Sequence, residues 1–311
     1  MKKKILVTGG TGFIGANLVR RLVKIGHRPA VLVRKESNLW RIKDIISKID
    51  LLETDILNYE GLKKDIEAVR PHLVYHLAVY GAYQKAQQDL HKTLEINIVG
   101  TLNLLNAVSQ CGAEYFINTG SSSEYGLKET SMSENDVLLP INYYGVTKAT
   151  TTLLASTYSV QNKLPAVTLR LFSPYGYFED KNRFVPTIIM SAINNKEIEL
   201  SDPGFVRDFV FIDDVIDAYT YFLNGKKYYG EIFNIGSGKQ TKLGDFVKKV
   251  EKVLQKKLKI KWSGHTSNQL EPKKWQADIS KVKSTLNWTP QFSLEEGIRK
   301  TYSWFKDNYK L

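Results

Sequence analysis

The chain has 311 residues, of which 42% are hydrophobic and 24% charged, and its formal net charge is +12. A chain of this length can bury the core of one large α/β domain or of two unequal domains, and no apolar run approaches the roughly 20 residues that a membrane span requires. The basic start MKKK is typical of a signal peptide, but TGGTG interrupts the apolar stretch behind it. The single cysteine, Cys111, excludes an internal disulfide and fits a reducing compartment. We therefore expect a cytoplasmic protein that is not bound to a membrane.

Much of the excess positive charge lies near the C-terminus, in KKVEKVLQKKLKIKW and EPKKW. Nucleic-acid binding would account for it, but no nucleic-acid-binding motif accompanies these lysines. Two other interpretations remain open: a lysine-rich solvated face, and a positive field that attracts a doubly anionic nucleotide substrate. We expect no nucleic acid among the partners.

Short apolar runs alternate with amphipathic stretches from the N-terminus to about Phe172. The apolar runs predict strands at residues 3–9, 28–34, 49–55, 71–78, 114–121 and 166–173. The amphipathic stretches predict helices at residues 15–26, 38–46, 58–69, 93–112 and 143–162. This alternation indicates an α/β fold with a parallel sheet that is covered by helices on both faces.

The alternation loosens after Phe172. The predicted elements that follow are a loop at 173–186, a helix at 187–195, a strand at 198–200, one more strand and helix of the large sheet at 207–223, a strand and turn at 231–238, and helices at 243–258 and 294–307. This predicts a dinucleotide-binding domain of residues 1–172, to which 206–230 return. Residues 173–205 and 231–311 are expected to form a smaller C-terminal α/β lobe. Such a lobe would cover the crevice beyond the carboxyl ends of the strands, where open α/β sheets bind ligands.

A glycine turn between the first predicted strand and helix is the first chemical motif. Gly9, Gly12 and Gly15 have the spacing G-x-x-G-x-x-G, which suits a tight turn, backbone approach to a pyrophosphate, and close packing of helix on strand. The first helical turn, with Phe13 and Ile14, would present N–H groups and a partial positive charge to the phosphates. The strand–turn–helix context favours a dinucleotide site over a tight turn without a ligand.

Two further motifs carry polar groups suited to catalysis. Tyr144 and Lys148 are four residues apart on a predicted helix, so they lie on one face, and an ammonium near a phenol lowers the pKa of the phenol. Tyr144 is therefore a candidate general acid/base, although the same spacing also occurs in surface pairs. Neighbouring Tyr143 has no lysine four residues on. The stretch NTGSSSEYG at 118–126 places serine hydroxyls at a strand end, where they bind a substrate oxygen or fill a turn.

In this order, the glycine turn, the serine-rich strand end and the Y-x-x-x-K motif resemble the short-chain dehydrogenase/reductase superfamily. With HLA at 76–78, RDFVFIDDV at 207–215 and a C-terminal lobe, the chain resembles its extended branch, the nucleotide-sugar epimerases, dehydratases and reductases. The resemblance runs from Lys4 to about Phe305. It implies a Rossmann domain, a doubly wound parallel sheet, with a small sugar-nucleotide-binding lobe. It also implies hydride transfer between a nicotinamide cofactor and a sugar carbon, usually C4, without a metal.

The resemblance assigns roles residue by residue. Tyr144 matches the tyrosine that moves the hydroxyl proton, and Lys148 matches the lysine that holds the ribose and tunes the tyrosine. Ser121 matches the residue that binds the reacting oxygen, with Ser122 as the alternative. Asn97 matches the asparagine that begins the long helix, which is more often structural than chemical. The expected cofactor contacts are Gly9, Gly12, Phe13, Ile14, Gly15, Arg34, Asp55, Ile56, Leu77, Ala78, Tyr144 and Lys148.

Substrate contacts are carried over in the same way. Arg207 of RDF resembles an arginine that clamps the substrate's diphosphate by bidentate hydrogen bonds; the alternative is a surface pair with Asp208. Ser173 stands where the family often has an asparagine that touches the nucleotide sugar. Lys274 stands where many members have an arginine, and would contact a phosphate with less geometric constraint. The expected substrate contacts are Ser122, Ser123, Ser173, Arg207 and Lys274.

The three serines at 121–123 narrow the choice among the reactions of the family. Family 4,6-dehydratases carry Thr-Asp-Glu at the positions of Ser121, Ser122 and Ser123, and their acids assist the loss of water. Here the acidic residue, Glu124, comes one place later. A dehydratase is therefore disfavoured.

Arg34 ends the second predicted strand, where Asp or Glu commonly accepts hydrogen bonds from the adenosine ribose. An arginine can pair with the 2′-phosphate of NADP, and Lys35 and Ser37 would add donors, whereas an exposed basic loop would tolerate either cofactor. NADP(H) is thus favoured, with NAD(H) possible. NADP(H) in turn favours the leading interpretation, reduction of an NDP-4-keto-(6-deoxy)hexose. The alternatives are an NDP-hexose 4-epimerase with retained NAD and, more remotely, a non-catalytic binding protein on the same fold.

The resemblance also implies partners. Members of this branch commonly dimerise through two helices per subunit, which here would be the helices around 97–108 and 146–159. A nucleoside-diphosphate sugar and a second copy of the chain are therefore the expected partners.

Overall fold

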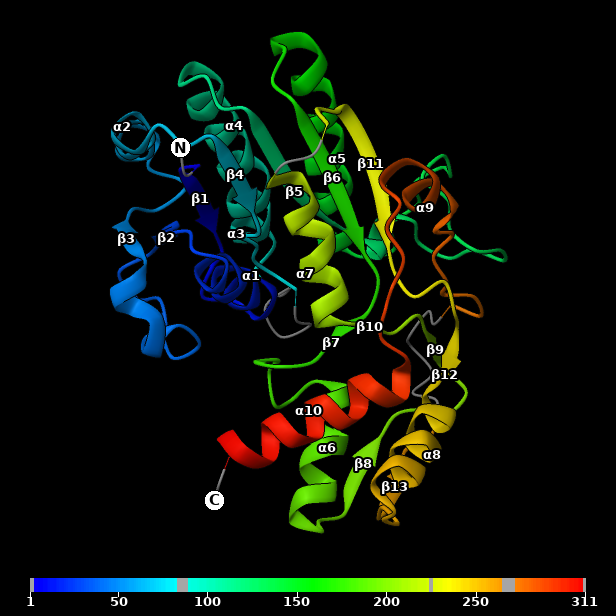
Figure 1. Ribbon diagram of the computed structural model, residues 1–311. Helices are drawn as coiled ribbons and strands as arrows, with labels where there is room; N and C mark the ends of the chain where they lie inside the picture. The colour runs from blue at the N-terminus through cyan, green and yellow to red at the C-terminus, as the bar shows by residue number, and fades with distance from the viewer. Residues whose placement is uncertain (1–2, 83–88, 224–225, 265–271, 310–311) are drawn as a thin grey trace. The chain divides into compact units, whose positions relative to one another are not determined.

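A seven-stranded sheet with helices on both faces dominates the first half of the chain in the computed structural model, which describes residues 3–82, 89–223, 226–264 and 272–309 (Figure 1). The strands lie in the order β11-β6-β5-β4-β1-β2-β3. Their bounds are β1 Ile5–Thr8, β2 Ala30–Val33, β3 Asp50–Glu53, β4 Leu73–His76, β5 Tyr115–Ser121, β6 Ala166–Leu171 and β11 Tyr229–Ile235. The pairings of β1 to β6 are parallel. The predicted doubly wound parallel sheet is confirmed.

The direction of winding reverses between β1 and β4. The chain passes outward from β1 to β2 and β3, and then returns to β4, on the other side of β1. Because crossovers between parallel strands are right-handed, the helices α2, α4 and α5 lie on the opposite face from α1, as Figure 1 shows. On that face α2 packs against α4, and α4 against α5. The helix bounds are α1 Phe13–Lys24, α2 Tyr59–Val69, α4 Gly100–Gln110 and α5 Tyr143–Asn162.

Continuous apolar runs form the central strands because both of their faces are covered. Leu6, Val74 and Phe116 of three adjacent strands are completely buried, together with Leu104 and Leu105 of α4. This core fixes the positions of the strand ends that carry the polar motifs.

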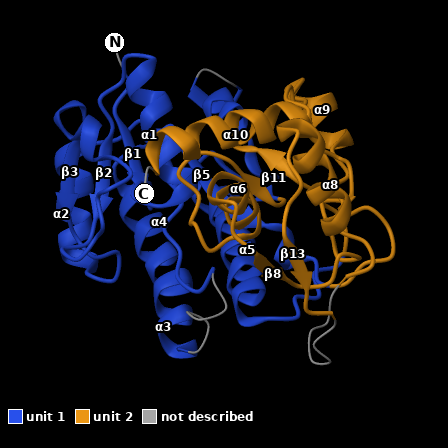
Figure 2. Cartoon of the chain, turned by 90° about the horizontal axis from the view of Figure 1, so that it is seen from below, with its two compact units in different colours: residues 1–126, 137–171, 216–233 blue, residues 127–136, 172–215, 234–311 orange. Residues whose placement is uncertain are grey.

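The chain divides into two compact units, drawn in two colours in Figure 2. The first consists of residues 1–126, 137–171 and 216–233, and the second of 127–136, 172–215 and 234–311. The elements that lie wholly in the second unit are β7 Pro174–Tyr175, α6 Phe184–Asn194, β8 Ile198–Leu200, β9 Val206–Arg207, β10 Val210–Phe211, β12 Thr241–Lys242, α8 Leu243–Leu254, β13 Ile260–Trp262, α9 Ser280–Leu286 and α10 Leu294–Asn308. Helix α7, Ile212–Thr220, runs from the second unit into the first.

Aromatic side chains make the core of the second unit. The ring of Phe246 on α8 lies 4.6 Å from that of Phe209 and 6.1 Å from that of Tyr175, centroid to centroid. Such edge and tilted arrangements are the favoured geometries of aromatic pairs. They hold α8 to β7 and to Phe209, which lies between β9 and β10.

The strand predicted at 207–223 does not join the large sheet. Val210 and Phe211 form β10, which pairs with β7 in a separate two-stranded sheet. The seventh strand of the large sheet is instead β11, beside β6. The prediction was wrong because β10 is only two residues long and its apolar pattern does not distinguish one sheet from another.

Two predicted helices also differ. Residues 38–46 contain only the start of a short 3₁₀ helix, Lys43–Lys48, because the Arg20 guanidinium takes the Arg41 carbonyl as its acceptor, at 3.0 and 2.8 Å from Nε and Nη2. The long helix at 93–112 is interrupted: α3, Leu90–Leu94, is followed by a π-helical turn, Glu95–Val99, before α4 begins.

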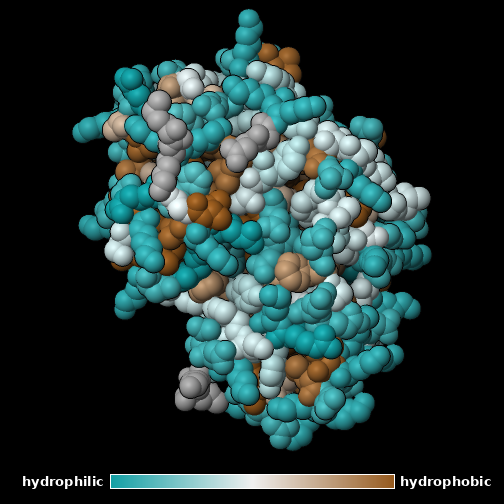
Figure 3. All heavy atoms as spheres, in the orientation of Figure 1, coloured by the Kyte–Doolittle hydropathy of each residue, from teal (hydrophilic) through white to brown (hydrophobic). Residues whose placement is uncertain are grey.

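The basic C-terminal segment lies on a solvated face. Helix α8 buries Leu243, Phe246 and Val250, while Lys248 and Lys252 on its other side are exposed. Hydrophilic residues cover most of the face drawn in Figure 3. No helix in the described part of the chain is long and apolar enough to cross a membrane.

We predict that Gly9→Ala destabilises the protein more than Gly112→Ala. Both glycines have a positive φ, +69° and +72°, which costs a non-glycine residue about 1–3 kcal/mol. A Cβ on Gly9 would also lie 2.5 Å from the Leu77 carbonyl carbon, whereas one on Gly112 meets nothing within 4 Å. Urea unfolding of both variants measures the difference, and equal losses would contradict this account of the turn.

Candidate functional site

The glycine turn packs directly on the residues that follow β4. Gly12 N donates to Gly9 O at 3.0 Å, and a Cβ on Gly15 would overlap that same Gly9 oxygen. Leu77 N donates to Thr8 O at 3.1 Å and Ala78 N to Thr8 Oγ1 at 3.2 Å. The turn, Leu77 and Ala78 therefore lie together at the carboxyl ends of β1 and β4, where the winding reverses and open α/β sheets bind ligands.

The N-terminus of α1 suits an anionic ligand. Its N-cap, Gly12, supplies no side-chain cap, and the first turn, which contains Phe13 and Ile14, has no acidic residue. A Cβ on Gly12 would come within 4 Å only of Gly9 O, at 3.2 Å. The N–H groups of the first turn and the helix dipole are thus left for a phosphate, as in dinucleotide-binding turns. The residues present fit a dinucleotide.

Arg34 follows β2 directly and is exposed. Ser37 Oγ accepts from Arg34 N at 2.9 Å, so the serine closes this turn. A second cation, which the motif spacing did not reveal, lies beside the glycine turn: Arg41 Nη1 donates to Thr11 O at 3.3 Å. Its guanidinium carbon lies 4.6 Å from the Trp40 ring centroid.

Asp55 and Ile56, which follow β3, differ in surroundings. Asp55 is exposed, and its Oδ1 accepts from Leu57 N at 2.9 Å. Ile56 is buried in the core of the sheet, where a Cβ on Gly100 of α4 would lie 2.7 Å from its Cγ2. The structure therefore gives Ile56 a packing role, while Asp55 remains accessible.

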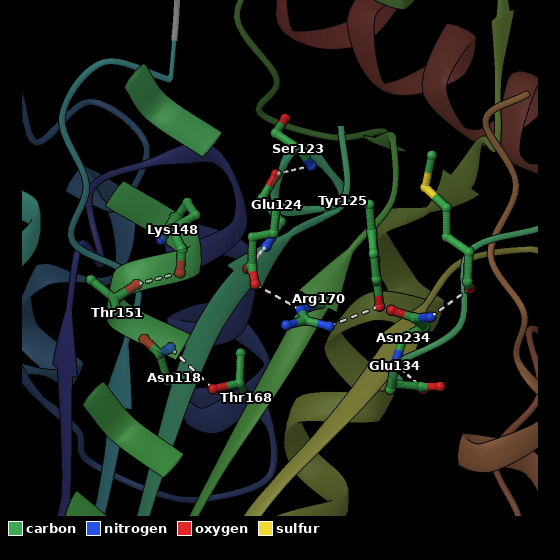
Figure 4. Close-up of polar contacts among 12 residues, drawn as sticks. Asn118, Ser123, Glu124, Tyr125, Glu134, Lys148, Thr151, Thr168, Arg170 and Asn234 are labelled. Carbon is green, nitrogen blue, oxygen red and sulfur yellow. Dashed lines mark hydrogen bonds and ion pairs between the residues drawn. The ribbon is translucent and has the colours of Figure 1, made fainter. Parts of the chain in front are cut away.

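The serine series forms a short capped turn at the end of β5. Ser121 Oγ accepts from Ser123 N at 3.1 Å, and Ser121 N donates to Glu124 Oε1 at 2.8 Å, which together make a capping box. Ser121 and Ser122 are buried and Ser123 is half-buried. Figure 4 shows Glu124 turned from this turn toward Arg170 on β6.

Helix α5 begins against the serine turn. Asn142 Oδ1 accepts from Gly145 N at 2.8 Å and caps the helix, which starts at Tyr143. A Cβ on Gly145 would lie 2.5 Å from Ser123 O. The first turn of α5, with Tyr144, is therefore brought next to the serines. Tyr144 is half-buried and Tyr143 is 55% exposed.

Lys148, one turn later, is buried and bonded to β5. Its Nζ donates to Thr119 O at 2.6 Å. Burial lowers the pKa of Lys148 to about 8, and the negative charge of Glu124 opposes this shift. Lys148 is therefore not half of a surface pair. It remains largely an ammonium at neutral pH.

Asn97 links the π-helical turn to α5. Its Nδ2 donates to Tyr80 O and to Thr147 Oγ1, both at 2.9 Å, and its Oδ1 accepts from Tyr80 N at 2.8 Å. Thr147 Oγ1 donates in turn to Tyr144 O at 2.9 Å. Because all of these hydrogen-bonding groups are engaged within the protein, Asn97 has a structural role.

His76, at the end of β4, is excluded as an acid/base group. Its ring nitrogens lie 2.8 Å from Thr8 Oγ1 and 2.9 Å from Thr101 Oγ1. Burial, followed by the charge of Lys148, lowers the pKa of His76 to about 3. The imidazole is therefore neutral under physiological conditions.

The second unit contains the remaining predicted contacts. Arg207 on β9 places its guanidinium carbon 5.6 Å from the Trp275 ring centroid, and half-buried Lys274 precedes that tryptophan. Ser173 is half-buried, and its carbonyl accepts from Val210 N at 3.2 Å. Arg207 thus lies beside the ring of Trp275, and Lys274 is the neighbour of that tryptophan in the chain.

Asp208 is buried, so the alternative of a surface pair with Arg207 was wrong. Its carboxylate accepts from Ser237 N and Oγ, both at 2.6 Å, from Gly238 N at 3.1 Å and from Ala277 N at 2.9 Å. Burial raises the pKa of Asp208, and these hydrogen bonds oppose the shift. Asp208 therefore links the turn after β11 to the segment that precedes α9.

Within the described ranges, no group of three or more His, Cys, Asp or Glu side chains is arranged to hold a metal ion. The features found at the carboxyl ends of the strands and the start of α5 are a glycine turn, serine hydroxyls, a tyrosine and a buried lysine. Residues 5–236, which contain all of these groups, match the NAD dependent epimerase/dehydratase family. The chain belongs to this family.

Individual relatives agree with this family over nearly the whole chain. A UDP-glucuronate 4-epimerase of Thermodesulfobacterium geofontis (strain OPF15) is 30% identical over 319 residues, which cover 98% of this chain and 97% of that protein. A dTDP-glucose 4,6-dehydratase of Neisseria meningitidis serogroup B is 27% identical over 334 residues, covering 98% and 94%. Similarity alone therefore does not select one reaction of the family.

The fold is shared with solved members of the family. The crystal structure of a UDP-glucuronic acid 4-epimerase from Bacillus cereus, in complex with UDP-glucuronic acid and NAD, matches with a TM-score of 0.87 and 30% identity. The match covers 98% of this chain and 100% of that chain. The resemblance to the extended short-chain dehydrogenase/reductase branch is thus confirmed.

Proposed function

We propose that the protein is a nucleotide-sugar 4-epimerase that uses a nicotinamide dinucleotide. The observation that carries this proposal is the position of Glu124, the acidic residue of the serine turn, whose carboxylate is buried. In family 4,6-dehydratases acids assist the loss of water, but here serines, Ser122 and Ser123, occupy the positions of those acids. Glu124 is completely buried and bonded to Arg170 at 2.7 Å. The turn therefore offers hydroxyls rather than a carboxyl group.

The roles of the polar residues follow from their surroundings. Ser121, whose Oγ already accepts from Ser123 N, has its hydroxyl proton left to donate to the reacting sugar oxygen. Tyr144 exchanges the proton of the reacting sugar hydroxyl, and the Lys148 ammonium favours the phenolate form of Tyr144. The bound dinucleotide would supply reversible hydride transfer at C4 of the sugar. Gly9, Gly12 and Gly15 would hold its pyrophosphate.

The choice between epimerase and reductase rests on the relatives and on Arg34. The similar UDP-glucuronate and UDP-glucuronic acid enzymes are named 4-epimerases, and one is solved with NAD; they support the epimerase alternative over the reductase favoured by the sequence. A UDP-sugar is accordingly the proposed substrate, with Arg207 and Lys274 of the second unit as its diphosphate contacts and Ser173 near its sugar. Arg34 favours a reductase, because its guanidinium suits the 2′-phosphate of NADP.

We predict that the protein interconverts a UDP-hexose or UDP-hexuronate pair without net change in absorbance at 340 nm, and that Tyr144→Phe lowers kcat about 100- to 10,000-fold because proton transfer is lost. Chromatography of the products with each of UDP-, dTDP-, GDP- and CDP-sugars measures turnover.

Tyr143→Phe is the matched control, since Tyr143 precedes Tyr144 on the same helix and is exposed; it should retain full activity. Turnover that survives Tyr144→Phe refutes the acid/base assignment. Stoichiometric NADPH consumption with an NDP-4-keto sugar, without interconversion of sugars, would establish the reductase instead.

We further infer that Arg34 gives the protein a preference for NADP over NAD, supported by its place after β2 and by the nearby Arg41. Arg34→Asp should weaken NADP binding about 10- to 100-fold, the loss expected for a charged hydrogen bond worth about 1.5–3 kcal/mol. It should not weaken NAD binding, because an Asp at this position accepts hydrogen bonds from the adenosine ribose. Fluorescence titration with both cofactors measures this, with Lys24→Ala at the exposed end of α1 as the control. An equal affinity of Arg34→Asp and the unmodified protein for NADP contradicts the inference.

We also propose a homodimer through α4 and α5. These helices pack side by side and expose apolar side chains, with exposures of 46% for Val99 just before α4, 37% for Leu102, and 57% for Leu153. We expect Leu153→Asp to shift the protein from dimer to monomer in light scattering after size exclusion, because a charge is costly to bury in an apolar interface. Ile25→Asp, at the end of α1, should leave the dimer intact. A monomeric unmodified protein would refute the proposal.

A further inference from the structure

Glu124 and Arg170 form an ion pair that is closed off from solvent. Arg170 Nε donates to Glu124 Oε2 at 2.7 Å, and the side chains are 2% and 0% exposed. Arg170 Nη1 also donates to Tyr125 Oη at 3.0 Å (Figure 4). The pair thus connects β6 to the turn that follows β5.

The sheet leaves a space for this pair at Gly120. In the β5–β6 register Gly120 lies opposite Arg170. A Cβ on Gly120 would lie 2.6 Å from Glu124 Oε1 and 2.9 Å from Arg170 Cγ. The Glu124 carboxylate and the Arg170 guanidinium can therefore meet only because Gly120 has no side chain.

The same carboxylate reaches the candidate site through its second oxygen. Glu124 Oε1 accepts from Ser121 N at 2.8 Å and completes the capping box whose other half is Ser121 Oγ. The conformation of the proposed oxyanion-binding serine thus depends on Glu124, which is held by Arg170.

Stability alone does not explain a buried ion pair. The desolvation cost of two buried charges commonly offsets their attraction, and apolar side chains of similar volume are often as stabilising. The position of this pair at the base of a proposed catalytic turn therefore points to a role in the chemistry.

We propose that Glu124 and Arg170 are positioning residues for the reaction: Arg170 fixes Glu124, which holds the Ser121 turn and keeps Lys148 in its ammonium form. This inference rests on the proposed function, because it assigns the ammonium a use in tuning Tyr144.

The charges around Lys148 support this assignment. Of the groups that face it, His76 on β4 is neutral because burial lowers its pKa to about 3. Tyr219 on α7, whose hydroxyl lies 2.7 Å from Thr119 Oγ1, is neutral because burial raises its pKa. Tyr144 precedes Lys148 by one turn. Burial raises the pKa of Glu124, and the charge of Arg170 opposes that shift. The negative charge of Glu124 in turn opposes the effect of burial on Lys148.

The test is the double variant Glu124→Gln/Arg170→Met, which removes both charges with little change in volume and keeps an amide oxygen for Ser121 N. Lys148 is titrated by NMR in protein labelled with ¹³Cε-lysine, with its resonance identified by its loss in Lys148→Met. We expect Lys148 to lose its proton at lower pH than in the unmodified protein. We also expect the alkaline limb of the kcat profile to move the same way, with kcat on that limb reduced about 10-fold for each pH unit of displacement and KM little changed.

Glu124→Asp and Lys3→Met/Glu114→Gln complete the design. The aspartate keeps the charge, so Lys148 should titrate closer to its native midpoint than in the double variant; it also serves if the double variant does not fold. The Lys3–Glu114 pair, 2.9 Å apart in the same unit, is partly exposed, and its loss should change neither readout.

An unchanged Lys148 midpoint and an unchanged kcat profile in the folded double variant overturn the proposal and leave the pair a packing role. The lysine titration needs no substrate, so it distinguishes this failure from that of the proposed function. If the unmodified protein interconverts no nucleotide sugar, the epimerase assignment fails while the titration still decides whether Glu124 controls the charge of Lys148.

Discussion

The hydrogen bond from Lys148 to the Thr119 carbonyl is the contact on which the candidate site depends. It joins α5 to β5 at the level where the strand ends, and it holds an ammonium group in a buried position. Such burial is costly unless the charge is bonded and balanced. The carbonyl supplies the bond, and the charge of Glu124 opposes the effect of burial on the pKa of Lys148. The strand end, the helix start and the serine turn thus form one connected arrangement.

The fold and the core of the site could be predicted from the sequence because both depend on local patterns. Apolar runs between amphipathic stretches indicated the parallel sheet, and the glycine spacing indicated the turn after β1. The resemblance to the family assigned Ser121 and Lys148 to one site, and in the structure Lys148 is bonded to Thr119, two residues before Ser121.

Long-range contacts account for what the sequence did not predict. The two-residue strand β10 pairs with β7 and not with the large sheet, and no local pattern specifies that partner. Arg41 reaches the glycine turn from a segment 30 residues away in the chain. Glu124 and Arg170 are 46 residues apart, and each alone looks like an ordinary surface charge. Asp208 likewise has backbone partners that are 29 to 69 residues distant.

The space at Gly120 also limits how this protein can be recombined with its relatives. Gly120 and Glu124 belong to the β5 segment and Arg170 to β6, and the three fit only as a set. A chimera with a crossover between these strands would keep the set only where the other parent has the same residues at these positions. Exchanges that carry residues 120–170 as one block keep the set together.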